Sequence, residues 1–250
     1  MAGRMTARHL ESPEGLVNQN RKARVIALDG PAASGKGTLA RRLADAYGFA
    51  YLDTGMLYRG VAWTVINGGD DPADPEKAGW YARHFDLAKI EGAPVRSREV
   101  GAAASKVAAH PSVRQALLDF QRSYAATPPG GEKGAVLDGR DIGTVVCPDA
   151  CVKFFVTASP EVRAHRRWLE LRDGKPDLLE ADVLRDLLER DARDRERKDA
   201  PMKPAPDAEM LDTTYLSIDA VEAAARRIID DALGSESVAA QGIGQPKYAE

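Results

Sequence analysis

The chain has 250 residues, enough for one large domain that buries its own core. Its 35 Lys and Arg residues are nearly balanced by 38 Asp and Glu residues, which argues against a protein that coats nucleic acid. No apolar run is long enough for a membrane helix, and two cysteines cannot form a disulfide framework. We therefore expect a cytoplasmic globular protein with no nucleic-acid partner and no membrane partner.

Short apolar runs alternate with helical patterns between two polar tails, 1–23 and 234–250, which we expect to be disordered. In chain order, strands are predicted at 24–29, 49–53, 135–138, 151–157 and 215–218. Helices are predicted at 35–47, 55–66, 100–124 with an interruption at Pro111, 160–172, 180–197 and 219–233. This alternation predicts an α/β fold of three layers, in which helices cover both faces of a mainly parallel sheet.

A glycine-rich loop between the first strand and the first helix is the sharpest motif. It fits Gly-x4-Gly-Lys, in which glycines let backbone N–H groups face phosphate oxygens and the lysine reaches the β- and γ-phosphates. Gly37 stands where the general motif has a hydroxyl residue, so Mg²⁺ would be held largely by water and phosphates, with no protein metal site. We assign ATP binding to the whole loop: Gly30, Pro31, Ala32, Ala33, Ser34, Gly35, Lys36, Gly37 and Thr38.

Charged residues follow two further predicted strands. Asp53, Thr54 and Arg59 follow the second strand, and Asp138 ends the third, just before Arg140 and Asp141. Ligands of such sheets bind beyond the carboxyl ends of the strands, so these side chains should lie near the phosphate loop. Asp138 is a candidate for orienting Mg²⁺, and the planar guanidinium of Arg59 suits an acceptor phosphate.

Two arginine-bearing helices are predicted on either side of a polar DGKPD turn. The first carries Arg163, Arg166 and Arg167. On the second, arginines recur at helical spacing on a face that also carries an aspartate: Arg190, Arg193, Asp194 and Arg197. A solvated helix with ion pairs is the ordinary interpretation of such a face. Here the pair suggests a lid that excludes water from a transferring phosphoryl group.

Several segments resemble, in sequence and order, the bacterial cytidylate kinases, which are nucleoside monophosphate (NMP) kinases: DGPAASGKGT, YLDTGMLYRG, LDGRDIGTVVCPDA and ERDARDRER. The resemblance implies a P-loop kinase domain over 24–233, with an NMP-binding region at about 67–130 and a helical lid at about 160–198. The family often carries a longer β-rich insert between positions 85 and 100, so this insertion looks short.

The resemblance also implies roles for matching positions. Acceptor-phosphate binding would fall to Arg59, Arg140 and Arg197; cytosine recognition to Ser105, Arg114 and Asp141; and sugar binding to Arg190 and Asp194. Arg163 and Arg167 would belong to the lid. The substrate-binding set is completed by Asp53, Thr54 and Tyr58. The catalytic set is Lys36, Asp138, Arg140, Arg167 and Arg197.

The leading hypothesis is transfer of the γ-phosphoryl group of ATP to CMP or dCMP, with Mg²⁺, by a monomer. A kinase for AMP, UMP or shikimate remains open, because only the resemblance favours cytosine. A non-catalytic nucleotide-binding module is a third possibility. It is disfavoured by Lys36, Asp138 and the lid arginines, which suit phosphoryl transfer.

Overall fold

The computed structural model describes residues 23–241 except 87–89, 91, 174 and 176, so the expected tails fall mostly outside the described residues. Five strands form one parallel sheet in the order β2-β3-β1-β4-β5. The strands are β1 (Arg24–Asp29), β2 (Ala50–Asp53), β3 (Gly134–Asp138), β4 (Val152–Thr157) and β5 (Glu209–Asp212). Because Leu28 and Asp53 both pair with Asp138, the acidic ends of β1, β2 and β3 meet at one edge.

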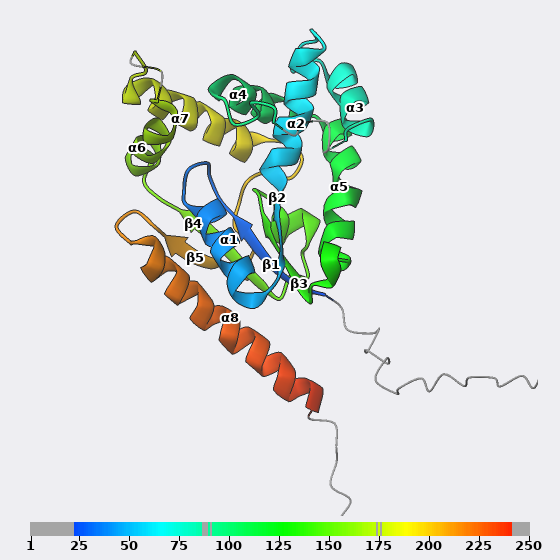
Figure 1. Ribbon diagram of the computed structural model, residues 1–250, viewed down its shortest axis with the longest axis vertical. Coiled ribbons are helices and arrows are strands. Elements are labelled where there is room, and N and C mark those ends of the chain that lie inside the picture. The colour runs from blue at the N-terminus through cyan, green and yellow to red at the C-terminus, as the bar shows by residue number, and fades with distance from the viewer. Residues whose placement is uncertain (1–22, 87–89, 91, 174, 176, 242–250) are drawn as a thin grey trace, which may run out of the picture.

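Helices cover both faces of this sheet, which confirms the predicted three-layer fold (Figure 1). Ile26 and Leu28 of β1 pack on one face against α1 (Lys36–Tyr47) and α8 (Ile218–Gln241). Val25 and Ala27 belong to the cluster on the other face, with α5 (Pro111–Ala126) and the short π-helix η3 (Ile142–Val146). Successive strand residues point to opposite faces, and both faces are covered, so the interior of β1 is apolar from Val25 to Leu28.

Two helical units stand beyond the carboxyl ends of the strands (Figure 1). One unit packs α2 (Thr54–Asn67), α3 (Pro75–Arg83) and α4 (Arg98–Val107) with α5 around a separate apolar cluster. The other packs α6 (Pro160–Leu171) against α7 (Glu180–Glu196) through Ala164, Val183 and Leu187. Proline at the first position of α5 explains the break that was expected at Pro111.

The prediction of a last strand at 215–218 is wrong. The fifth strand is β5, and Tyr215 is 95% exposed while Ser217 accepts the backbone N–H of Ala220 at the start of α8. The error arose because β5 is a mostly exposed edge strand without an apolar run. Helix α8 also continues to Gln241, beyond the predicted end at Leu233. No helix among the described residues is long and apolar enough to cross a membrane.

Candidate active site

Two adjoining pockets lie between the phosphate loop and the two helical units. The larger has a volume of about 760 Å³. Its predicted site residues are Ala32, Ala33, Gly35, Lys36, Gly37, Thr38, Asp53, Arg59, Asp138, Arg140, Arg167 and Arg190. The smaller pocket is lined by Thr54, Tyr58, Ser105, Arg114, Asp141, Asp194 and Arg197, and it shares Arg140 and Arg190 with the larger one. Of the residues predicted to bind ATP or the acceptor or to act in catalysis, only Gly30, Pro31 and Ser34 line neither pocket.

The phosphate loop connects β1 to the first turn of α1, and its shape depends on glycine. Gly30 has φ +142°, and a Cβ there would lie 2.0 Å from the carbonyl oxygen of Val156. Arg163 Nη1 donates to the carbonyl of Ala32 at 3.3 Å, and Thr213 Oγ1 donates to that of Ser34 at 2.9 Å. The loop is therefore held from α6 and from the end of β5, and its curled backbone faces the larger pocket.

Lys36 and Asp138 face each other beneath the phosphate loop. Lys36 Nζ donates to the carbonyl of Pro31 at 3.2 Å and lies 3.6 Å from Asp138 Oδ1. Burial and the nearby charge of Arg140 lower the pKa of Lys36 to about 8, against the opposing effect of Asp138. Burial raises the pKa of Asp138. A phosphate group beside Lys36 would favour the charged form of the lysine, which burial and Arg140 disfavour.

The donor set beside Lys36 fits Mg²⁺. Asp138 Oδ1 is buried without a hydrogen-bond partner among the described residues, and a Cβ at Gly37 would lie 3.0 Å from Asp138 Oδ2. Carboxylate oxygens suit Mg²⁺, which usually keeps several waters and phosphate oxygens as its other ligands. The described residues hold no cluster of three or more His, Cys, Asp and Glu side chains able to bind a metal. A magnesium ion at this place would have the Asp138 carboxylate beside it, together with water and phosphate oxygens.

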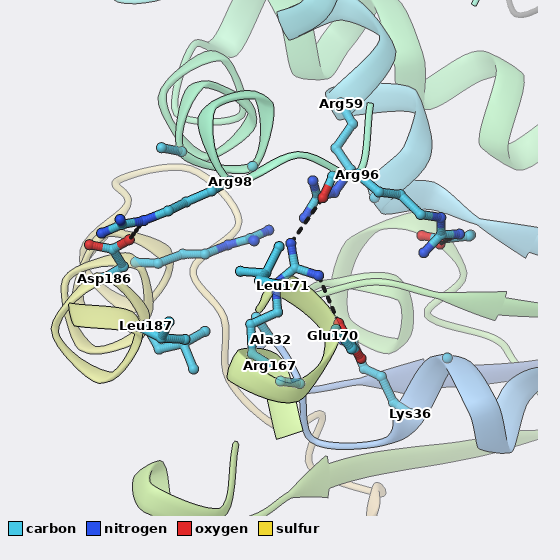
Figure 2. Close-up of a pocket in the computed structure, with 18 of the residues that line it drawn as sticks. Ala32, Lys36, Arg59, Arg96, Arg98, Arg167, Glu170, Leu171, Asp186 and Leu187 are labelled. Carbon is cyan, nitrogen blue, oxygen red and sulfur yellow. Dashed lines mark hydrogen bonds and ion pairs between the residues drawn. The ribbon is translucent and has the colours of Figure 1, made fainter. Parts of the chain in front are cut away.

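Arginines from five helices line the larger pocket, and in Figure 2 Arg59 and Arg167 enter it from opposite sides. Burial, together with Arg190 and Arg167, lowers the pKa of Arg59 to about 9. Burial and Arg140 likewise lower the pKa of Arg190 to about 10. Arg167 donates to Glu170 and to the carbonyl of Arg96 at 3.0 Å (Figure 2). Such crowding of positive charge is suited to a polyanionic ligand.

The smaller pocket combines a carboxylate with guanidinium donors. Asp141 forms an ion pair with Arg114, and the Arg114 guanidinium lies 5.8 Å from the ring centre of Tyr58. Arg114 Nη1 is buried and has no hydrogen-bond partner among the described residues. Ser105 Oγ accepts a hydrogen bond from Arg193 Nε at 3.3 Å. A fixed acceptor beside free donor capacity can read the edge of a nucleobase.

Arg163 and Arg167, the two residues predicted to belong to a lid, both lie on α6, but in different environments. Arg163 is 2% exposed and lines neither pocket. Its Nη2 lies 2.7 Å from Asp191 of α7, and its Nε donates to the carbonyl of Ala158 at 3.0 Å. Arg163 thus joins α6, α7 and the phosphate loop, while Arg167 faces the pocket.

Several basic residues of the larger pocket escaped prediction. Arg96 lies 3.7 Å from Asp53, and Arg98 forms an ion pair with Asp186 across α4 and α7. Lys106 also lines this pocket. Lys106 lies within a predicted helix, and the only sequence signal of Arg96 and Arg98 is a basic Arg-x-Arg pair before that helix. The partners of Arg96 and Arg98 lie on β2 and α7, which are distant from them in sequence.

Known proteins resemble this chain over most of its length. A sequence model described as cytidylate kinase matches residues 26–231. The chain is 58% identical over 205 residues to a cytidylate kinase of Rhodospirillum rubrum, covering 82% of this chain and 96% of that one. It is 54% identical over 208 residues to a cytidylate kinase of Caulobacter vibrioides, covering 83% and 96%. The chain therefore belongs to the cytidylate kinase family.

Proposed function

We propose that this protein transfers the γ-phosphoryl group of ATP to CMP or dCMP, giving ADP and CDP or dCDP, in pyrimidine nucleotide metabolism. The observation that carries the proposal is the pocket pair itself. A phosphate loop and an arginine-lined cavity adjoin a smaller pocket that holds the Asp141–Arg114 pair. One pocket suits two phosphate groups in line, and the other suits a base.

The arrangement suits transfer between two anions without a strong base. The attacking oxygen belongs to the acceptor phosphate, which is already ionised at neutral pH. Catalysis then depends on positioning and on neutralising charge. Lys36 would bind the donor β- and γ-phosphates, and Arg59, Arg140 and Arg197 would hold the acceptor phosphate. Mg²⁺ oriented by Asp138 would neutralise charge on the donor phosphates.

The smaller pocket supports a preference for cytosine. The carboxylate of Asp141 can accept from the exocyclic amino group, while Arg114 and Ser105 can donate to the ring nitrogen and carbonyl. Uracil has a carbonyl in place of that amino group, and a carboxylate facing it would be repelled. Asp194 with Arg190 would take the sugar hydroxyls. Tyr58 would support the pocket by packing against Arg114, with Thr54 beside it.

The lid would keep water from the phosphoryl group. Arg167 projects from α6 into the larger pocket, so closing α6 and α7 would bring its charge over the transferring group. Arg190 and Arg197 lie on α7 and at its end, so the same movement would tighten the acceptor site. Without such exclusion, a phosphate-loop kinase would hydrolyse ATP.

An acceptor panel tests the proposal. ADP release from ATP and Mg²⁺ would be measured with CMP, dCMP, UMP, AMP and shikimate, and with no acceptor. We expect CMP and dCMP to give the highest kcat/KM. Absence of stimulation by CMP over buffer would overturn the assignment. Turnover of shikimate or AMP instead would favour another small-molecule kinase, and tight ATP binding with no acceptor turned over would favour a binding module.

A further inference from the structure

Asp29 is a buried carboxylate to which the proposed reaction assigns no part. It ends β1, directly before Gly30 of the phosphate loop, and it is 3% exposed. Its Oδ1 accepts the backbone N–H of Ile142 at 2.7 Å, and its Oδ2 accepts that of Gly143 at 2.7 Å. Both donors belong to the first turn of η3, where N–H groups have no partner within the helix.

The segment between these contacts carries two of the proposed acceptor-binding residues. At its start, the N–H of Gly139 donates to the carbonyl of Leu28 at 2.9 Å. The last two residues of β1 therefore hold both ends of the segment, and Arg140 and Asp141 lie between them with access to the smaller pocket. Within η3, the carbonyl of Asp141 accepts the N–H of Val145 at 2.9 Å, so the backbone of Asp141 is fixed on both sides.

A charged group at this position is expensive to bury. Burial, with smaller contributions from the charges of Asp141 and Asp138, raises the pKa of Asp29 to about 7 against the effect of the two N–H donors. A neutral asparagine would avoid that penalty, but its NH₂ group would confront one of the two donors. What the position requires is two acceptor oxygens side by side, and only a carboxylate supplies them.

We propose that Asp29 is a positioning residue for acceptor recognition, which sets Asp141 by holding the N–H groups of Ile142 and Gly143. This inference rests on the proposed function. Because Asp29 adjoins Gly30, the contact also links the segment that carries Asp141 to the strand that precedes the phosphate loop. A shift of that segment would disturb the base pocket more than the phosphate loop, since Lys36 and Gly35 are held by other contacts.

Asp29→Asn tests the proposal in the full-length protein. Losing one of two charge-assisted hydrogen bonds should raise KM for CMP about tenfold, with kcat and KM for ATP within about twofold. The preference for CMP over UMP should fall as well. Asp207→Asn is the matched control, because it removes a carboxylate that pairs with Lys153, whose side chain also borders Gly143, without touching the two N–H groups. The control should behave as wild type.

A second variant approaches the same contact from the other side. A Cβ at Gly143 would lie 3.4 Å from Asp29 Oδ2 and 3.1 Å from Lys153 Cδ, so Gly143→Ala crowds this contact and should raise KM for CMP less than Asp29→Asn does. The kcat and KM of wild type with CMP and dCMP are measured first. A wild type that is inactive with both acceptors would refute the proposed function, not the role of Asp29. If wild type uses CMP, unchanged KM and base preference in folded Asp29→Asn would overturn the proposal. So would equal losses towards ATP and CMP.

Discussion

Arg140 Nε donates to Asp194 Oδ2 at 3.1 Å, and this contact joins the loop after β3 to helix α7. Arg190 and Arg197 lie 3.8 and 3.9 Å from the same carboxylate group. The buried carboxylate of Asp194 thus forms ion pairs with three guanidinium groups. It holds them together without neutralising them, so the acceptor site is assembled yet remains positively charged.

Asp194→Asn should reveal this role through stability. Burial alone would raise the pKa of Asp194, but Arg140, Arg190 and Arg197 hold it below its ordinary value. A lowered pKa means that the carboxylate stabilises the fold above pH 4 and that this stabilisation is lost as pH falls further. We expect the variant to lose about 3 kcal/mol of unfolding free energy at pH 7, as when one partner of a buried pair is removed.

Urea unfolding at pH 7 and pH 3 measures the difference in unfolding free energy between wild type and Asp194→Asn. This difference should be smaller at pH 3. Asp219→Asn is the control, because Asp219 pairs with Arg42 on the exposed surface and should change stability by less than about 1 kcal/mol. An equal loss for Asp194→Asn at both pH values would contradict the electrostatic account.

ATP binding should take up protons at Lys36. The pKa of Lys36 is lowered to about 8 by burial and Arg140, so near pH 8 about half of the empty protein carries a neutral Lys36. Donor phosphates would favour the charged form. Calorimetric titration with ATP in buffers of different ionisation enthalpy should show uptake of about half a proton at pH 8. Lys36→Met should remove that uptake, and equal uptake in the variant would refute the assignment.

The phosphate loop and the acceptor segment could be predicted because their signals are local. Motif spacing fixes the loop, and the rule that parallel strands end at one edge brings Asp53 and Asp138 to it. The contact of Asp29 with Ile142 could not be predicted, because it spans 113 positions and leaves no periodic pattern. Helical spacing likewise groups Arg163 with Arg167, yet it cannot say which of them faces Asp191 and which faces the cavity.

Inorganic phosphate should stabilise the empty protein through Arg59. Burial and the charges of Arg190 and Arg167 lower the pKa of Arg59 to about 9, so an anion would relieve their repulsion. Phosphate at ten times its Kd should raise Tm by roughly 4 °C. The rise should shrink in Arg59→Met and persist in Arg42→Met, whose guanidinium pairs with Glu222 on the outer surface. Equal rises in both variants would place the anion elsewhere.

Arg163 and Arg167 lie one helical turn apart on α6, and we expect the first to act on stability and the second on catalysis. Removing the partner of Arg163 by Asp191→Ala leaves a buried charge unpaired and should cost about 3–5 kcal/mol of unfolding free energy. Arg167→Ala should keep the stability of wild type while lowering kcat by about 100-fold, because its charge would act on the transferring group. Thermal unfolding and kcat measured on both variants check this, and a reversed pattern would exchange the two roles.

Asp29→Asn should stabilise the protein at alkaline pH while impairing its choice of acceptor. Burial raises the pKa of Asp29 from 3.8 to about 7 in the folded protein, so its stabilising contribution is complete below pH 3.8 and is lost as pH rises through 7. Between pH 4 and pH 8 the raised pKa of this one group should cost wild type about 4 kcal/mol of unfolding free energy relative to the variant. Parallel stability curves from urea unfolding would contradict this. A neutral side chain at position 29 would give a more stable fold at alkaline pH. The hydrogen bonds from Asp29 to the N–H groups of Ile142 and Gly143, which position Asp141, explain why a carboxylate stands there.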